Sequence, residues 1–406
     1  MDYDPFSDEV LDDPHRVYAR LRAESPVHYL EAFDTWALAL FEDVWNAGAE
    51  TAHFVQPGPV IELAGVREGQ LLAEAQAEVL ESGASIFIMN PPQHTQLRKR
   101  LARLFSPQGV ARLEPGLRAL VCERLDAVLP TGRCDVIGDF AAQIAVQATC
   151  LLIGLPVGDG PALVETVRRF FAREPGFAGM PPDGIAASLE LREYLWQAVR
   201  TRRKRADRHD DAMQAYLDFE LEGRPLTDEE VAMHLMTLVT GGTETLPKVF
   251  AGGVLQLYRH PEQRAELAAD PSLLPSAFTE IARTEMPTNF LTRTVAKDLV
   301  LRDRQLRAGQ GVMLLYRSAN RDEREFPEPD RFDIHRRAAR TLSFGHGTHV
   351  CLGQHVARLE ARIMLEELLR RVPDYAVLED EVVPARSEFV AGYLAMPIAF
   401  GGDPAL

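Results

Sequence analysis

The sequence predicts a mainly helical protein with a few small β-sheets, folded as a single domain over residues 1–406. Most of the chain carries apolar residues at helical spacing, whereas strand-like runs are few and short. The length exceeds that of a typical domain, yet the chain contains no Gly/Ser tract, low-complexity segment or repeat at which it would divide. Hydrophobic residues make up 46% of the chain, which is enough for one large core.

Helices are predicted over residues 92–105, 117–128 and 144–152, and the proline- and glycine-rich stretch 175–184 is predicted to be a loop. A longer helix is predicted from Thr227 to about Tyr258. Thr227 and Glu230 have the spacing of a capping box at its start. At about 1.5 Å per residue this helix is roughly 48 Å long, enough to cross the molecule. A last long helix is expected over residues 353–371.

Strand signals are concentrated in the C-terminal third of the chain. Leu299–Leu301 and Val312–Tyr316 flank the turn-forming stretch Ala308–Gly311 and predict a β-hairpin. Further short strands are expected near residues 374–378 and 396–400.

Charge and composition exclude several classes of protein. The net charge of −16 argues against a nucleic-acid partner, which requires a basic face. The acidic N-terminus lacks the basic and apolar regions of a signal peptide, and no apolar stretch is expected to reach the length of a membrane span. The four cysteines form no C-x-x-C pair and no zinc-binding spacing, which fits a reducing compartment. We therefore expect a soluble, cytoplasmic protein.

The most informative segment is Phe344–Gly353, with the sequence FGHGTHVCLG. An isolated cysteine is usually a small buried apolar residue. Here Cys351 lies in a loop with three glycines, an aromatic residue and histidines, just before a predicted helix. Glycines allow the backbone to turn tightly, so that amide N–H groups can point at the sulfur. Such a loop is suited to presenting one thiolate to a metal.

The pattern F-G-x-G-x-H-x-C-x-G resembles the haem-binding loop of the cytochrome P450 family, and every fixed position matches. The resemblance implies a cytochrome P450 fold, with haem b between the long central helix and the helix that follows the cysteine. It makes Cys351 the axial thiolate ligand of the iron, and Phe344, His349 and Gly353 parts of the haem-binding loop. A thiolate ligand pushes electron density toward the iron and favours cleavage of the O–O bond.

The long central helix contains a second motif, Gly241-Gly242-Thr243-Glu244-Thr245, followed by Leu246-Pro247. Glycines and a proline inside a helix weaken it, by about 1 and 3 kcal/mol per residue respectively. The motif resembles the oxygen-binding segment (A/G)-G-x-(D/E)-T of the same family. By this resemblance Gly241 borders the haem, Glu244 relays protons and the Thr245 hydroxyl hydrogen-bonds to the oxygen. Many family members carry a second small polar residue where this chain has Leu246-Pro247.

Two further sets of residues match the family in chain order. Glu280 and Arg283 form an E-x-x-R pair, which the resemblance implies is buried and completed by a third residue, either Arg331 or Arg336. The other set would hold the two haem propionates, and consists of His94, Arg98, Arg293 and His349. Each of these residues alone could be an ordinary surface or core residue. The match to the family is supported because all of them occur in the family's order along the chain.

The resemblance implies a monooxygenase that uses haem b and dioxygen to oxidise a hydrophobic small molecule. The residues expected to line its substrate pocket are Thr240, Thr243, Asn289, Phe290, Leu291 and Val390, together with the stretch from His53 to Phe87. Asn289, Thr240 and Thr243 are the candidate hydrogen-bonding groups. Electrons would come from a separate ferredoxin, docking on the basic patch of Arg98, Lys99, Arg100, Arg103 and Arg358. The alternatives are a peroxide-driven peroxygenase and a haem sensor without turnover.

Overall fold

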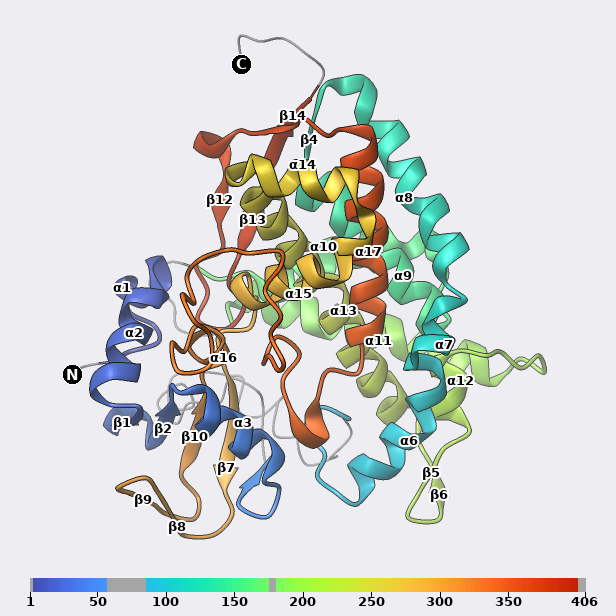
Figure 1. Ribbon diagram of the computed structural model, residues 1–406. Coiled ribbons are helices and arrows are strands. Elements are labelled where there is room, and N and C mark those ends of the chain that lie inside the picture. Colours follow the sequence, from blue (N-terminus) through green and yellow to red (C-terminus); the bar gives the residue numbers. More distant parts are fainter. Residues whose placement is uncertain (1–2, 57–84, 175–179, 401–406) are drawn as a thin grey trace.

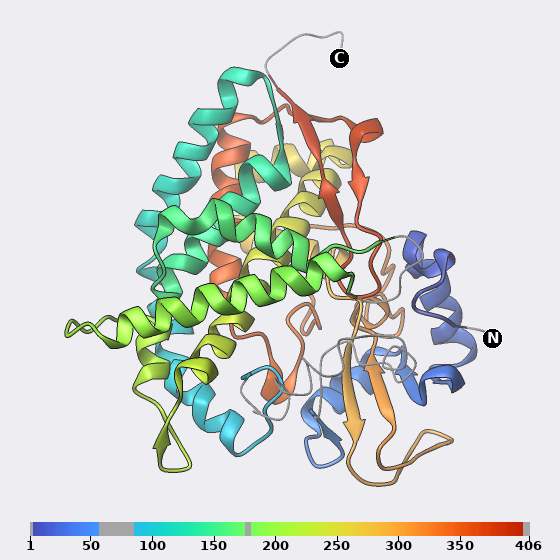
Figure 2. The same ribbon diagram turned by 180° about the vertical axis from the view of Figure 1, so that it is seen from behind.

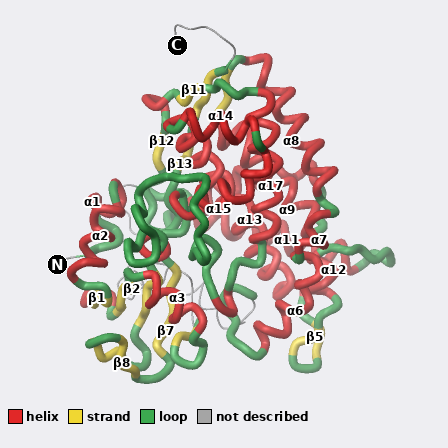
Figure 3. Tube along the Cα trace, viewed as in Figure 1, coloured by secondary structure: helices red, strands yellow, loops and turns green. Residues whose placement is uncertain are grey.

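Helices form the larger part of the protein. Most of the small sheets lie along one side of it, and a short two-stranded sheet at residues 220–225 lies on the opposite side (Figures 1 and 3). The computed structural model describes residues 3–56, 85–174 and 180–400. The helices are α1 (Asp8–Asp12), α2 (Pro14–Glu24), α3 (Phe41–Ala49), α6 (Gln93–Phe105), α7 (Pro107–Ala111), α8 (Glu114–Val128), α9 (Ala142–Ile153), α10 (Gly160–Phe171), α11 (Pro182–Arg203), α12 (Ala212–Leu217), α13 (Asp228–Arg259), α14 (Pro261–Ala269), α15 (Leu274–Thr284), α16 (Tyr316–Ala319) and α17 (Gln354–Arg371).

The largest sheet has five strands in the order β1-β2-β10-β7-β3. Its strand β10 pairs in parallel with β2, with Gly311 opposite Thr35, and antiparallel with β7. This sheet therefore joins the N-terminal segment to the C-terminal third of the chain. The strands are β1 (Val27–Leu30), β2 (Thr35–Leu38), β3 (Phe54–Val55), β4 (Arg133–Asp135), β5 (Glu220–Leu221), β6 (Arg224–Pro225), β7 (Leu291–Val295), β8 (Leu299–Leu301), β9 (Arg304–Leu306), β10 (Gly311–Leu314), β11 (Ala376–Val377), β12 (Val383–Pro384), β13 (Tyr393–Ala395) and β14 (Pro397–Ala399).

Helix α13 crosses the molecule as predicted, and both hydrogen bonds of its capping box are formed. It packs against α9, α10, α11 and α15. Seen from behind, α10 and α11 lie across it (Figure 2). Its buried face contributes much of the main apolar core, which also includes α8, α9 and α17. The predicted helices at 92–105, 117–128, 144–152 and 353–371 are present as α6, α8, α9 and α17.

The predicted hairpin between residues 299 and 316 is wrong in its pairing. Strand β8 pairs with β9 across a two-residue turn, whereas β10 lies in the five-stranded sheet. Strand β9 was not predicted because two of its three residues, Arg304 and Gln305, are polar and exposed. The turn at Gly309, whose φ is +92°, therefore connects β9 to β10.

Two other expectations need revision. The stretch Val136–Ile153 reaches 18 residues with a mean hydropathy of 1.7, so one segment does have the length and composition of a membrane span. It is 67% buried and packs against α13, as a core helix does. The loop predicted at 175–184 lies partly outside the described residues, and α11 already begins at Pro182.

Candidate active site

Cys351 lies immediately before α17, in a loop that passes between α3 and α6 (Figure 1). The backbone N–H of Cys351 donates to the carbonyl of Phe344 at 2.8 Å, which closes the loop on itself. The guanidinium of Arg358, one turn into α17, lies 4.8 Å from the centre of the Phe344 ring. The loop is therefore tied to the helix that follows it.

Two glycines of this loop adopt a backbone conformation that other residues rarely adopt. Gly345 has φ +69° and Gly347 has φ +76°. A Cβ atom at Gly347 would also lie 2.2 Å from the carbonyl oxygen of Gly48 in α3, so the two backbones are in direct contact. Glycine is required at position 347 for both reasons. The predicted tight turn is thus present, and it docks the loop against α3.

The Cys351 side chain is accessible and lines a cavity of about 390 Å³ between α6 and the cysteine loop. Desolvation raises the pKa of the Cys351 thiol although its side chain is accessible, while the backbone N–H of Gly353 and the charge of Arg98 lower it in part. A bound metal cation favours the thiolate over the thiol. Among the described residues, no group of three His, Cys, Asp or Glu side chains could hold a metal ion.

Four cationic or donor side chains lie near this cavity, from three separate parts of the chain. They are His94 and Arg98 on α6, Arg293 on β7, and His349 in the loop. The rings of His94 and His349 stack with their centres 4.0 Å apart. Both ring nitrogens of His94 are buried without a hydrogen-bond partner among the described residues. None of the four forms an ion pair with a carboxylate of the described part of the chain.

The pKa values of these groups are lowered by burial and by the positive charges of their neighbours, with no compensating negative charge. Burial, followed by Arg98 and Arg293, lowers the pKa of His94 to about 4. Burial, followed by His94 and the two arginines, lowers the pKa of His349 to about 2. Burial also lowers the pKa of Arg293. Buried cations without partners are costly, so the arrangement fits a ligand with two carboxylates, such as the propionates of haem.

The glycine-rich segment of α13 has one open and one packed face. A Cβ atom at Gly241 would contact nothing within 4 Å, whereas one at Gly242 would lie 2.5 Å from the Thr149 hydroxyl oxygen on α9. Gly242 is thus needed for helix packing, and Gly241 leaves space beside the helix. The Thr245 hydroxyl donates to the carbonyl of Gly241 at 2.8 Å.

The predicted acid of this segment, Glu244, does not contact Thr245. Its carboxylate oxygen lies 2.8 Å from the ammonium of Lys248, one turn further along α13. Both side chains are largely buried, with 13% and 6% of their surface exposed. Burial raises the pKa of Glu244 above its ordinary value, and Lys248 opposes this effect. Lys248 was not among the predicted site residues, although its spacing of four residues from Glu244 in a helix was a usable signal.

The third partner of the E-x-x-R pair is Arg336. Glu280 accepts two hydrogen bonds from Arg283, both at 2.7 Å, and a third from Arg336 at 3.0 Å. Arg283 also donates to the carbonyls of Asn320 and Pro329. Arg331 instead pairs with Glu328 on the surface, so it is excluded as the third member. The set anchors the long irregular segment before the cysteine loop to α15.

Several residues predicted to line the substrate pocket form hydrogen bonds or packing contacts within the protein. The Asn289 amide donates to the carbonyls of Ser387 and Glu388 and accepts from Arg317. Its hydrogen-bonding groups are therefore already used within the protein and are not available to a substrate. Phe290 is fully buried in a cluster with residues of α1 and α2. Both residues lie just before β7, and the sequence does not specify which way their side chains face.

The remaining pocket candidates have mixed environments. The Thr240 hydroxyl donates to the carbonyl of Met236 in its own helix, while the buried Thr243 hydroxyl has no partner among the described residues. Leu291 is half-buried against the second apolar cluster, and Val390 is buried beside Thr288, with which it forms a β-bridge. The predicted pocket stretch from His53 to Phe87 lies mostly outside the described residues.

The basic patch predicted on α6 is largely neutralised. Arg100 pairs with Asp218 at 3.3 Å, and Arg103 and Arg112 both pair with Asp210. Arg358 donates to the Thr279 hydroxyl and covers the Phe344 ring. Lys99 is exposed, lines the cavity that contains Cys351, and has no carboxylate partner within the described ranges. The surface beside the cysteine loop is therefore less basic than the sequence suggests.

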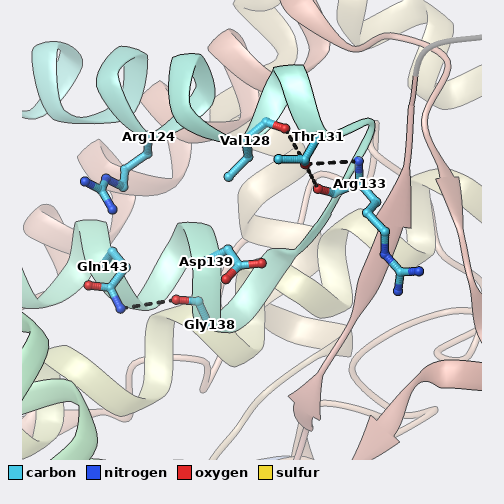
Figure 4. Close-up of a pocket in the computed structure, with 7 residues that line it drawn as sticks. All are labelled: Arg124, Val128, Thr131, Arg133, Gly138, Asp139 and Gln143. Carbon is cyan, nitrogen blue, oxygen red and sulfur yellow. Dashed lines mark hydrogen bonds between the residues drawn. The ribbon is translucent and has the colours of Figure 1, made fainter.

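A second hollow of about 340 Å³ lies between the C-terminal end of α8, the start of β4 and the turn before α9 (Figure 4). Its polar groups include Thr131 and Gln143, whose side chains hydrogen-bond to backbone carbonyls of the same region. It lies near the end of α17 rather than at its start, and none of the predicted site residues lines it. The chemistry predicted for this chain belongs to the cavity at Cys351.

Comparison with known proteins agrees with this geometry. The sequence model of the family described as "Cytochrome P450" matches residues 186–373. The vitamin D(3) 25-hydroxylase of Pseudonocardia autotrophica is 35% identical over 407 residues, covering 98% of this chain and 96% of that protein. The methyl-branched lipid omega-hydroxylase of Mycobacterium tuberculosis is 29% identical over 417 residues, covering 98% and 93%.

A solved structure gives the same result in three dimensions. The structure of CYP109E1 from Bacillus megaterium in complex with testosterone matches with a TM-score of 0.84 and 26% identity, covering 98% of this chain and all of that one. The sequence similarity over nearly the whole length settles the relationship. The chain therefore belongs to the cytochrome P450 family, whose members are monooxygenases that use haem b and dioxygen.

Proposed function

We propose that this protein hydroxylates a hydrophobic small molecule, with Cys351 as the axial ligand of haem iron and electrons supplied by a separate ferredoxin. The observation that carries the proposal is the pairing of a cavity-lining thiol with a buried cluster of histidines and arginines that has no carboxylate partner among the described residues. His94, Arg98, Arg293 and His349 would hold the propionates. Gly241 and Thr245 would border the side of the haem opposite Cys351, where the Thr245 hydroxyl would hold a proton. When bound, the haem supplies the dioxygen chemistry.

The substrate class is inferred from the relatives. Vitamin D3, a methyl-branched lipid and testosterone, which appear in the names of three of them, are large and mostly apolar. We infer a substrate of this kind for the present chain. Thr243 is its best candidate for a hydrogen bond, because its buried hydroxyl has no partner in the part of the chain that the structure describes.

The direct test is the absorption spectrum of the purified, haem-loaded protein after reduction and exposure to carbon monoxide. A strongly red-shifted Soret band is expected, since a thiolate ligand donates charge to the iron. A screen of sterols and lipids for displacement of the sixth-ligand water would then identify substrates. A band at the position of histidine-ligated haem would refute the proposal.

Replacing Thr245 by alanine should leave haem and substrate binding unchanged but divert electrons to hydrogen peroxide. The reason is that the variant lacks the hydroxyl that we assign to proton delivery on the distal side. We expect product per reductant consumed to fall by about tenfold or more, since a positioned proton donor commonly contributes roughly 10²–10⁴-fold. Thr245→Ser keeps the hydroxyl and serves as the control. Efficient peroxide-driven turnover that is insensitive to Thr245→Ala would instead identify a peroxygenase.

Docking of an acidic ferredoxin should depend on Lys99, because Arg100 and Arg103 on α6 already have carboxylate partners. We expect Lys99→Glu to slow reduction by a ferredoxin several-fold at low salt, and the difference should shrink as ionic strength rises. Lys297→Glu, on the turn after β7, makes the same change in charge away from this face. Equal effects of the two substitutions would argue against docking beside the cysteine loop.

A further inference from the structure

The segment 85–89 is fastened to the first half of α13 by two hydrogen bonds. The backbone N–H of Ile86 donates to Nδ1 of His234 at 2.9 Å. The hydroxyl oxygens of Ser85 and Thr237 lie 2.6 Å apart and form the second bond. The bonded residues are 148 and 152 positions apart in the chain, so these two contacts fix where the segment lies in the fold.

His234 is a buried histidine in the state that can accept this hydrogen bond. It is 1% exposed, and burial lowers its pKa to about 3, with a small opposing effect of Glu230. The imidazole is therefore neutral near pH 7, and the ring nitrogen that accepts from Ile86 carries no proton. The ring of Tyr216 on α12 stacks on the imidazole, with the ring centres 4.8 Å apart and the planes 11° apart. This stacking fixes the plane of the imidazole and with it the direction of the hydrogen bond.

His234 and Thr237 lie on the face of α13 that leads to its open part. They precede Gly241 by seven and four residues, and Thr245 follows Gly241 by four, so all four residues share one stripe of the helix. A Cβ atom at Gly241 would contact nothing within 4 Å. The segment 85–89 therefore lies against α13 about one helical turn before this open space begins.

The other end of the segment is fixed as well. The Asn90 side chain donates to the carbonyl of Gln56 at 2.7 Å and accepts from the backbone N–H of Gln56 at 2.9 Å. Within the segment, the backbone N–H groups of Ile88 and Met89 both donate to the carbonyl of Ser85. The segment is thus a closed turn, tied to α13 at its start and to the residue after β3 at its end.

This turn presents two apolar side chains that the core does not take up. Ile86 and Met89 are 6% and 8% exposed and belong to the main apolar core. Phe87 and Ile88 are only half-buried, and they pack against none of the three core clusters that the described residues form. A half-buried aromatic ring on a fixed turn is suited to contact an apolar ligand.

We propose that His234 is a positioning residue for substrate binding, which holds the segment 85–89 against α13 so that Phe87 forms a wall of the substrate pocket. The inference rests on the proposed function, because it concerns the pocket of the same reaction. His234 acts through the backbone of Ile86 and does not itself touch the substrate. Its replacement should therefore weaken the binding of apolar ligands and leave the ligation of iron by Cys351 intact.

The first test measures the hydrogen bond from Ile86 and needs no turnover. His234→Phe keeps an aromatic ring for the stack on Tyr216 but lacks the accepting nitrogen. In the haem-loaded protein, hydrogen–deuterium exchange measured by mass spectrometry should show the Ile86 amide exchanging roughly fivefold faster, as expected for the loss of one hydrogen bond. An unchanged exchange rate in this variant would overturn the proposal.

Two further variants separate the hydrogen bond from the packing around it. His234→Asn places a side-chain oxygen near the position of Nδ1 and should restore slow exchange of the Ile86 amide. Tyr216→Phe is the matched control, because it keeps the stacked ring and removes only a buried hydroxyl that has no partner among the described residues. Exchange as fast in Tyr216→Phe as in His234→Phe would mean that general packing protects the amide, and the role of the acceptor would be refuted.

The second test separates the pocket wall from the iron. Imidazole and 4-phenylimidazole both bind haem iron through a ring nitrogen, and only the second presents a phenyl group to the pocket. We expect His234→Phe to raise the dissociation constant of 4-phenylimidazole by about tenfold, comparable to the loss of one apolar side-chain contact, and to leave that of imidazole unchanged. Both are followed by the shift of the Soret band. Equal weakening of the two ligands, or of neither, would overturn the proposal.

A double-mutant cycle tests whether His234 acts through Phe87. Phe87→Ala alone should weaken 4-phenylimidazole by a similar factor, and the combined variant should be little weaker than either one, since both changes remove the same contact. Additive losses, or wild-type affinity in Phe87→Ala, would contradict this role. The carbon monoxide spectrum is recorded for each protein. Absence of the red shift in the wild type refutes the proposed function, whereas a red-shifted band with unchanged ligand binding in the variants refutes only the role of His234.

Discussion

Replacing Cys351 by serine is expected to abolish the red-shifted carbon monoxide band and all oxygenase turnover. Serine has nearly the shape of cysteine, so the closed loop and its hydrogen bond from residue 351 to the Phe344 carbonyl should persist. Its hydroxyl is not a soft anionic ligand and cannot push charge toward iron as a thiolate does. The variant should therefore fold normally but bind haem more weakly than the wild-type protein. Its Soret band in the carbon monoxide form should lack the strong red shift.

Cys122→Ser is the matched control for this experiment. Cys122 is a partly exposed free cysteine on α8, away from the cavity that contains Cys351. We expect its replacement to change neither the spectrum nor turnover. A Cys351→Ser protein that kept the red-shifted band would show that another residue ligates the iron, and the proposed site would be wrong.

Replacing Arg336 by glutamine is expected to destabilise the protein by about 3–5 kcal/mol, because it removes a partner from a buried charge network. Glu280 has a side chain that is only 1% exposed, and Arg336 donates to it at 3.0 Å. The same arginine also donates to the backbone carbonyls of Pro327, Glu328 and Arg331. One substitution thus loosens the whole segment that leads to the cysteine loop.

Arg331→Gln provides a control five residues away in the same segment. Its side chain is exposed and pairs only with the exposed Glu328, so we expect a change of about 0–1 kcal/mol. Urea unfolding followed by circular dichroism, with haem retention followed by absorbance, measures both variants. Equal destabilisation by the two substitutions would contradict the assignment of Arg336 to the network.

Local sequence patterns were sufficient for the elements whose signals are strong. The capping box at Thr227 and Glu230 predicted the start of α13, and the glycine pattern around Cys351 predicted a tight turn. Both depend on residues close together in the chain, where backbone geometry follows directly from residue type. The convergence of His94, Arg293 and His349 could be expected only through the family resemblance, because three separate segments bring them together.

Features set by tertiary packing were missed or misassigned. Strand β10 was assigned to the wrong partner because a sequence pattern does not specify which distant strand it will pair with. Asn289 was taken for a substrate handle, since nothing in the sequence reveals that its amide anchors residues 387 and 388. Arg100 and Arg103 looked free because their partners, Asp218 and Asp210, lie more than a hundred residues away in the chain.

The pairing of β2 with β10 and the contact of Gly347 with Gly48 have a consequence for biosynthesis. A ribosome releases the N-terminal segment first, yet β2 cannot complete its sheet until residues 311–314 have been translated. Throughout that interval β2 exposes an unpaired edge, which is prone to pair with other chains. The cysteine loop docks on α3 and is translated only after β10. Haem capture is thus expected to be a late event that follows translation of most of the chain.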